Sequence, residues 1–212
     1  FGIACALGYV DAARLLLEKG ADVNQATENG QTPLYAACQN GCVDAARLLL
    51  DKGVEVDRAD KDGMTPIYVA CRHGHVDAVR LLLDKGAAVD RAEKYGRTPL
   101  WVACSEGHVD LARLLLDKGA DVNKADEDGY KPLSIADSRN HSGSHSAIIE
   151  LLEEFERASR LASPIPEPPT LPHPWHSFWD ASSERYYFSH PDTGQVQWEI
   201  PVAAPPMAST GN

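Results

Sequence analysis

The stretch "KDGMTPIYVACRHGHVDAVRLLLDKGAAVDRAE", residues 61–93, decides the architecture of most of the chain, because it is one copy of a 33-residue repeat. Full copies also occupy residues 28–60 and 94–126, a partial copy occupies residues 1–27, and a degenerate copy occupies residues 127–162. A fixed period of this length is typical of a solenoid, in which each unit buries its apolar face against the next. We therefore expect one continuous stack of repeats. Because the chain begins inside a repeat, we also expect it to be part of a longer protein.

Each repeat carries local signals for a turn followed by two short helices. Gly63 marks a turn that favours a residue with positive φ. Thr65 is placed to cap the first helix through its hydroxyl, and Pro66 fills the first helical position, where a missing N–H costs nothing. Gly74 ends this helix, and Gly86 is placed as the left-handed cap of the second helix, "VDAVRLLL". The same residue types recur in the other full copies, so the sequence predicts a mainly α-helical solenoid.

The patterns "G-x-TPL", "GH-VD-A-LLL" and "GADVN" make the repeat resemble the ankyrin repeat over about residues 1 to 155. The resemblance implies pairs of antiparallel helices with turn tips that project to one side. Where this family usually has His after "TPL", the chain has Tyr35, Tyr68 and Trp101. In the last copy Lys131 replaces the capping threonine, and we expect that unit to close the stack with a polar outer face.

The resemblance also implies a concave surface, formed by the turn tips and the first helices, that binds a protein partner. The residues of this chain at the matching positions are Gln31, Gln39, Asn40, Met64, Arg72, His73, Tyr95, Arg97, Trp101, Ser105 and Glu106. Arginine and aromatic residues on an accessible surface are typical of interface hot spots. For Tyr35, Tyr68 and Trp101 a second interpretation fits the sequence equally well. In that interpretation the rings pack between neighbouring repeats, and only their polar ends reach water.

Charge and cysteine spacing limit the other functions of the chain. The formal net charge is −11 and no cluster of Lys and Arg is visible, so we expect no binding to nucleic acid. No apolar run reaches the ~20 residues that a membrane helix needs, so we expect no membrane insertion. Cys5, Cys38, Cys71 and Cys104 are copies of one repeat position, and in a stack of helices they lie ~10 Å apart. This separation is too large for disulfide bonds, so we expect free thiols in a reducing compartment, the cytoplasm or the nucleus.

The sequence shows no recognisable catalytic or metal-binding constellation. His75, His108 and His145 occupy one repeat position, and we interpret them as turn contacts rather than as zinc ligands, which cluster tightly. A glycine-rich phosphate loop and a nucleophile motif are both lacking. We therefore predict a non-catalytic protein without a metal or cofactor, and we expect it to be a monomer.

The composition changes after the repeats. Residues 163–170, "SPIPEPPT", form a proline-rich linker that we expect to adopt an extended polyproline II conformation. Residues 171–201 contain three short runs rich in β-forming residues, "WHSFWD", "RYYFSH" and "QVQWEI". These runs predict a small three-stranded antiparallel sheet. Residues 202–212 are polar and proline-rich, and we expect them to be disordered.

Residues 171–201 resemble a WW domain in the leading "LP", the two tryptophans 23 residues apart, the aromatic pair between them and the closing proline. The apolar groups available to pack the two ends together are Leu171, Pro172, Trp175, Tyr187 and Pro201. Strand alternation places Tyr187 on this packed face, and Tyr186 and Phe188 on the other face. The resemblance then implies that Tyr186 and Trp198 form a slot for a proline ring, with Phe178 beside them.

A proline-rich peptide is the ligand that this resemblance implies. His190 matches the position that contacts the ligand tyrosine in family members that prefer Pro-Pro-x-Tyr, which favours that class. The aromatic residues of the slot, Phe188 among them, also suit Pro-Leu-Pro ligands. The sequence thus predicts an adaptor with one surface for a protein partner and one for a proline-rich segment. Alternatively, the chain is a regulatory part of a larger enzyme whose catalytic domain lies outside it.

Overall fold

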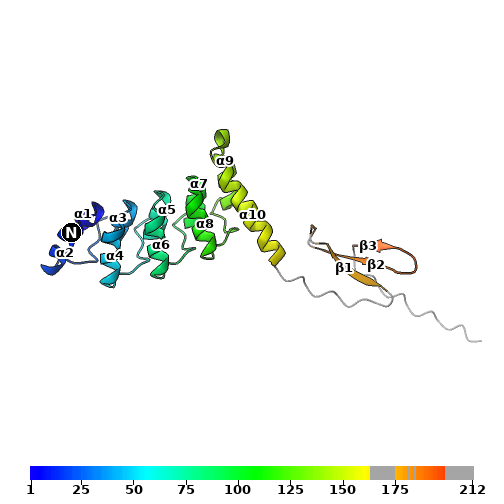
Figure 1. Cartoon of the computed structure of the whole chain (residues 1–212), viewed down its shortest axis with the longest axis horizontal. Coiled ribbons are helices and arrows are strands. Elements are labelled where there is room, and N and C mark those ends of the chain that lie inside the picture. Colours follow the sequence, from blue (N-terminus) through cyan, green and yellow to red (C-terminus); the bar gives the residue numbers. More distant parts are fainter. Residues whose placement is uncertain (163–174, 181, 184, 199–212) are drawn as a thin grey trace, which may run out of the picture. The chain divides into compact units, whose positions relative to one another are not determined.

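The chain divides into two compact units, Phe1–Glu156 and Arg157–Asn212. The computed structural model describes residues 1–162, 175–180, 182–183 and 185–198 of the chain. The first unit consists of helices, and the second contains a small sheet (Figure 1). The predicted fold class, an α-helical solenoid followed by a small antiparallel sheet, is therefore confirmed.

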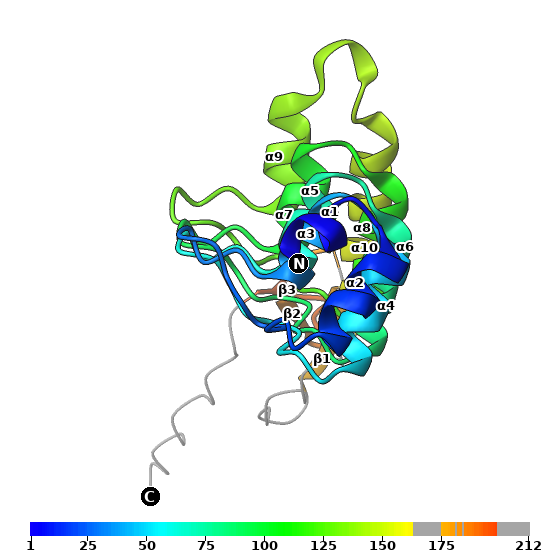
Figure 2. The ribbon, with the colours of Figure 1, turned by 90° about the vertical axis from the view of Figure 1, so that its left-hand side faces the viewer.

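Over residues 1–162 the helices form antiparallel pairs, one pair per repeat. The first helices of the pairs are α1 (Gly2–Ala6), α3 (Pro33–Gln39), α5 (Pro66–Arg72), α7 (Pro99–Ser105) and α9 (Pro132–Arg139). The second helices are α2 (Val10–Glu18), α4 (Val43–Asp51), α6 (Val76–Asp84), α8 (Val109–Asp117) and, after a 3-10 turn at His141–Gly143, α10 (Ser146–Ala162). First helices contact first helices of adjacent repeats, and α2, α4, α6 and α8 contact one another in the same order. Figure 2 shows the resulting two layers, with the turn tips projecting to one side.

The threonine, proline and glycine residues at the helix ends have the roles that the sequence predicts. The hydroxyl of Thr65 accepts a hydrogen bond from the backbone N–H of Tyr68 at 3.3 Å, and Pro66 is the first residue of α5. The equivalent threonines cap α3 and α7 in the same way. Gly63 and Gly86 have φ angles of 80° and 87°, which a residue with a side chain adopts only with strain. Each repeat therefore begins and ends through contacts between residues close in sequence.

Leucines of the second helices form the centre of the stack. Leu49, Leu82 and Leu115 occupy one repeat position, and each is 0% exposed. At ~1.5–3 kcal/mol per fully buried leucine, this packing outweighs helix propensity. Leu16 occupies the same position in the first repeat but is 38% exposed. Leu152, which lies at the same distance from the repeat histidine in the last copy, is 0% exposed, so the burial is complete at this position in the repeats that follow the first one.

A histidine connects each of the later repeats to the one before it. Nε2 of His75 lies 3.1 Å from the carbonyl oxygen of Gln39, and Nε2 of His108 lies 3.4 Å from that of Arg72. The last repeat keeps the same contact at 3.1 Å, although its loop is longer. The ring also packs on a glycine of the preceding repeat, because a Cβ built on Gly41 would lie 2.6 Å from Nδ1 of His75. These are the turn contacts expected from the sequence.

The second unit contains an antiparallel sheet of three strands in the order β1-β2-β3, among its described residues. The strands are β1 (His176–Asp180), β2 (Arg185–Ser189) and β3 (Val196–Gln197). Phe178 pairs with Tyr187 across the first two strands, and Phe188 pairs with Gln197 across the last two. The linker at 163–170, the tail at 202–212 and three of the groups expected to pack the sheet ends lie outside the described residues. Those three groups are Leu171, Pro172 and Pro201.

The cysteines lie in the described repeats, and all five are free thiols. Burial raises the pKa of Cys104 to about 12, so this thiol stays protonated and is a weak nucleophile at neutral pH. Among the described residues, no three His, Cys, Asp or Glu side chains are grouped to hold a metal ion. None of the described helices has the length and apolar character to cross a membrane.

Candidate binding surfaces

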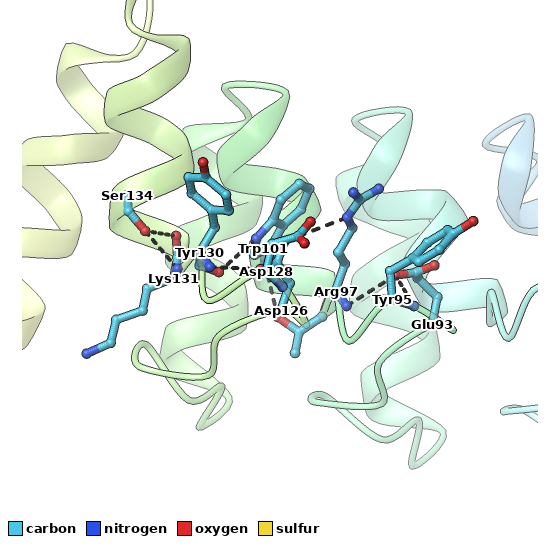
Figure 3. A network of polar contacts seen from close by, with 10 residues as sticks. Glu93, Tyr95, Arg97, Trp101, Asp126, Asp128, Tyr130, Lys131 and Ser134 are labelled. Atoms are coloured by element: carbon cyan, nitrogen blue, oxygen red, sulfur yellow. Dashed lines mark hydrogen bonds and ion pairs between the residues drawn. The ribbon is translucent and has the colours of Figure 1, made fainter.

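The turn tips and the first helices together form what we call the tip surface. Acidic residues at the ends of the repeats hold the turns in place. Oε1 of Glu93 accepts hydrogen bonds from the backbone N–H groups of Tyr95 and Arg97, at 2.9 and 3.2 Å. Oδ1 of Asp126 accepts one from the N–H of Tyr130 at 2.8 Å (Figure 3). Both carboxylates are buried, 8% exposed each, so the turns they organise have a fixed shape.

Arg97 is held between two aromatic rings of the tip surface. Its guanidinium carbon lies 4.8 Å from the centre of the Trp101 ring and 5.3 Å from that of the Tyr95 ring. Its Nε is buried and has no hydrogen-bond partner, and it lies 3.9 Å from Oδ2 of Asp126. This distance permits an ion pair but exceeds that of a hydrogen bond. Figure 3 shows the terminal nitrogens of Arg97 directed away from the turn.

The rings that replace the usual histidine of the repeat are buried. Tyr35, Tyr68 and Trp101 are 3%, 5% and 6% exposed, and burial raises the pKa of Tyr68 to about 12. Nε1 of Trp101 donates a hydrogen bond to the carbonyl oxygen of Tyr130 in the next repeat at 3.0 Å. Of the two interpretations, packing between repeats is therefore the one the structure supports. Trp101 and Ser105, 6% and 2% exposed, offer little surface to a partner.

Residues from several repeats line one depression of about 310 Å³ in the tip surface. Arg72, Arg97 and Glu106 were expected at such a surface from the sequence, and all three line it. Tyr130 and Arg139, from the degenerate last repeat, also line it, and sequence reasoning missed them. Extending the 33-residue period one more step would have found both, because they fall at the positions of Arg97 and Glu106.

The predicted residues Trp101 and Ser105 also line this depression, whereas six other predicted residues do not. They are Gln31, Gln39, Asn40, Met64, His73 and Tyr95. Gln31 lines a separate depression of about 340 Å³ at the N-terminal end of the stack, and Met64 packs against the core. Gln39 is half-buried, whereas Asn40 and His73, which follow the ends of α3 and α5, are exposed. Partial burial and the charge of the neighbouring arginine lower the pKa of His73.

Three aromatic rings gather on one face of the small sheet, and we call them the aromatic triad. The rings of Phe178 and Tyr187 stack with centres 5.3 Å apart, and the ring of Trp198 lies 5.6 Å from that of Tyr187. Phe178 is 46% exposed and Trp198 is 53% exposed. The triad is therefore an accessible apolar surface built on paired strands.

Tyr186 and Tyr187 lie on opposite faces of this sheet, as alternation predicts, but Phe178 and Trp198 lie with Tyr187 rather than with Tyr186. Tyr187 faces the same side as Phe178 and Trp198, whereas Tyr186 packs edge-on against Trp179 on the opposite side, with ring centres 5.0 Å apart. Phe188, expected in the slot, is 2% exposed. Alternation alone separates Tyr187 from its neighbours but does not say which face is covered, and a shift of one residue in register exchanges the faces.

His190 lies beside the first tryptophan of the sheet. Its ring packs edge-on against the ring of Trp175, with centres 5.2 Å apart, and its Nδ1 is buried without a hydrogen-bond partner. Of the groups expected to pack the ends of the domain, Trp175 and Tyr187 are described: Trp175 contacts His190, and Tyr187 contacts Phe178 and Trp198. The role of His190 toward a ligand tyrosine stays a prediction.

Comparison with known families gives matches in both units. Ankyrin repeats (3 copies) match residues 1–93, 54–126 and 89–158, and a WW domain matches residues 171–201. Both resemblances noted in the sequence are thereby confirmed. DEAD-box ATP-dependent RNA helicase 40 of Arabidopsis thaliana is 44% identical to this chain over 45 residues, which make up 21% of the chain and 4% of the helicase. The similarity thus spans only a small part of that protein.

Proposed function

Because this chain belongs to the ankyrin-repeat family and carries a WW domain, we propose that it is a non-catalytic adaptor with two binding surfaces. Both domain types are protein-interaction modules. The tip surface takes a protein partner, and the aromatic triad takes a proline-rich peptide. The observation that carries this proposal is the exposure of the triad.

Exposed aromatic rings on one face of a small sheet suit a polyproline ligand. Phe178 and Trp198 leave about half of their surfaces open, although burial of aromatic rings is a main source of stability in small domains. A polyproline II helix is ordered before it binds, so it loses little conformational entropy when its proline rings dock on aromatic side chains. The three rings of the triad lie within 5.3 to 5.6 Å of their neighbours, which gives a continuous apolar surface for such rings.

The ligand class follows from the place of His190. The sequence favours Pro-Pro-x-Tyr through this residue alone, but the packing of its ring on Trp175 supports a ligand that needs no tyrosine. We therefore propose that the triad binds Pro-Leu-Pro and Pro-Pro-x-Tyr peptides with similar affinity.

The test is a titration of the full chain with Pro-Leu-Pro, Pro-Pro-x-Tyr and scrambled peptides, followed by tryptophan fluorescence. We expect saturable binding of both proline peptides and none of the scrambled one. Trp198→Ala and Tyr187→Ala should abolish binding, whereas Tyr186→Ala should retain it. Near-ultraviolet circular dichroism of each variant shows whether the sheet is still folded.

Each other outcome has a defined meaning. Loss of binding in a folded Tyr186→Ala variant, with binding kept in Tyr187→Ala, would restore the assignment made from the sequence. Selective weakening of the tyrosine peptide in His190→Ala would establish the Pro-Pro-x-Tyr class. If no proline peptide binds to the folded chain, the triad is not a proline-binding site.

A second candidate function is a regulatory part of a larger enzyme. The observation in its favour is the similarity to an RNA helicase, of which the aligned segment covers 4%. The test is to sequence the complete transcript that encodes this chain. A catalytic domain in the same reading frame would support this second function, and a frame with only binding modules would exclude it.

A further inference from the structure

We propose that the depression around Arg97 binds an acidic peptide segment, in which an Asp or Glu side chain lies next to an apolar residue. The inference rests on the proposed function, because it gives the chemistry of the partner that the tip surface takes. Three arginines line this depression, each from a different repeat: Arg72, Arg97 and Arg139. Glu106, Asp126 and Asp128 line it as well, so positive and negative charges balance here, whereas the chain as a whole carries a net charge of −11.

Arg97 is organised for a carboxylate before any ligand arrives. The rings of Tyr95 and Trp101 hold its guanidinium at 5.3 and 4.8 Å, and Asp126 lies near its Nε. A guanidinium fixed in this way loses little side-chain entropy when it binds. Its terminal N–H groups form a planar fork that matches the two oxygens of a carboxylate.

Asp126 does not satisfy the charge of Arg97. Its Oδ1 accepts hydrogen bonds from the backbone N–H groups of Asp128 and Tyr130, at 3.1 and 2.8 Å. Its Oδ2 lies 3.9 Å from Nε of Arg97, beyond hydrogen-bond distance. The carboxylate thus orients the arginine without closing its outer edge, which is the edge that Figure 3 shows directed away from the turn.

The surroundings of Arg97 favour a neighbouring apolar residue on the ligand. Tyr95 and Tyr130 are each 48% exposed, and they come from the turns of two successive repeats. Exposed tyrosine rings beside an arginine are typical of the centre of a peptide-binding interface. They offer apolar contact to the residues that flank the ligand carboxylate.

The acidic residues of the depression disfavour a polyanion more than a single carboxylate. Glu106 and Asp128 are exposed and line the same space as the arginines. A run of phosphates would bring negative charge against these two carboxylates. A peptide with one carboxylate between apolar residues reaches Arg97 and avoids that repulsion.

The experiment is a selection of short random peptides that lack proline, displayed on phage, against the full chain carrying Trp198→Ala. The Trp198→Ala substitution removes one ring of the aromatic triad, and peptides without proline are not ligands for it, so the selection does not act through the triad. We expect the enriched peptides to share an Asp or Glu beside an apolar residue. Their affinity should fall about tenfold or more in Arg97→Gln, fall less in Arg97→Lys, and stay unchanged in Arg113→Gln. Arg113 is the matched control, because it is exposed on α8 of the same repeat.

Thermal unfolding of each variant shows whether the repeats stay folded. Enriched peptides without an acidic residue, or acidic peptides that bind Arg97→Gln as well as the parent, would overturn the inference, as would no enrichment. Enriched non-acidic peptides whose binding is lost in Tyr95→Ala would leave the tip surface as a partner site. That outcome would refute the inference but not the proposed function.

Discussion

In the repeats Trp101 is 6% exposed, whereas in the small sheet Trp198 is 53% exposed. The two residues are chemically identical; Trp101 lies within α7, and Trp198 directly follows β3. A ring in the stack has a repeat on either side, so both of its faces are covered. A single sheet has two faces and not enough chain to cover both. The same residue type is therefore buried between repeats in one unit and exposed on the sheet in the other, where we propose that it binds a ligand.

The strongest test of this comparison replaces each tryptophan with alanine. Trp101→Ala should lower the free energy of unfolding of the repeats by about 3–5 kcal/mol, because it leaves a cavity and removes the hydrogen bond to Tyr130. Trp198→Ala should change it by less than about 0.5 kcal/mol and abolish binding of proline peptides. Urea unfolding followed by helical circular dichroism measures the first quantity, and the peptide titration measures the second. Equal destabilisation by the two variants would break the comparison.

A second test asks whether the exposure of a leucine at one repeat position sets its contribution to stability. Leu82→Ala, at a position 0% exposed in the middle of the stack, should destabilise the repeats by about 2–5 kcal/mol. Leu16→Ala removes the same atoms at the same repeat position, but its side chain is 38% exposed, so we expect a loss below about 1 kcal/mol. Urea unfolding measures both. A similar loss in both variants would show that the exposure of the side chain does not set its contribution.

A third test separates contacts between repeats from backbone strain. Gly41 and Gly53 have φ angles of 67° and 79°, so alanine strains the backbone at either position. Only at Gly41 does the new Cβ also meet a side chain, the ring of His75, at 2.6 Å, whereas nothing lies within 4 Å at Gly53. Gly41→Ala should therefore cost about 1–3 kcal/mol more than Gly53→Ala. Equal melting temperatures would mean that the histidine contact adds nothing.

The smallest effect is expected for a contact within one repeat. Thr65→Ala removes the hydroxyl that caps α5 and should cost about 1 kcal/mol, while Thr65→Ser keeps the hydroxyl and should cost less. Differential scanning calorimetry of the two variants checks this order. If both lose the same stability, the buried methyl group of Thr65 matters and the cap does not. The threonine is not needed at the start of every first helix. In α9 Lys131 replaces it, and there the hydroxyl of Ser134 accepts a hydrogen bond from the backbone N–H of Lys131 at 2.7 Å.

The binding surfaces were less accessible to sequence reasoning than the repeats. Arg97 and Glu106, which the sequence assigns to the concave surface because they fall within unbroken repeats, line the depression. Tyr130 and Arg139 were missed because the last repeat has lost the motifs that mark the register, although its turn is still in phase. The burial of Trp101 was left open, because a sequence does not say how closely the next repeat approaches.

The sequence by itself determined the repeat, the helix ends and the existence of the sheet. Each of these depends on residues a few positions apart, such as the hydroxyl of Thr65 and the N–H three residues later. Only the tertiary structure decided which rings are exposed. Whether Tyr186 or Tyr187 faces Trp198 depends on the register between strands, and whether Trp101 is covered depends on the next repeat. Pairings between distant parts of the chain set both, and no local pattern of residues specifies them.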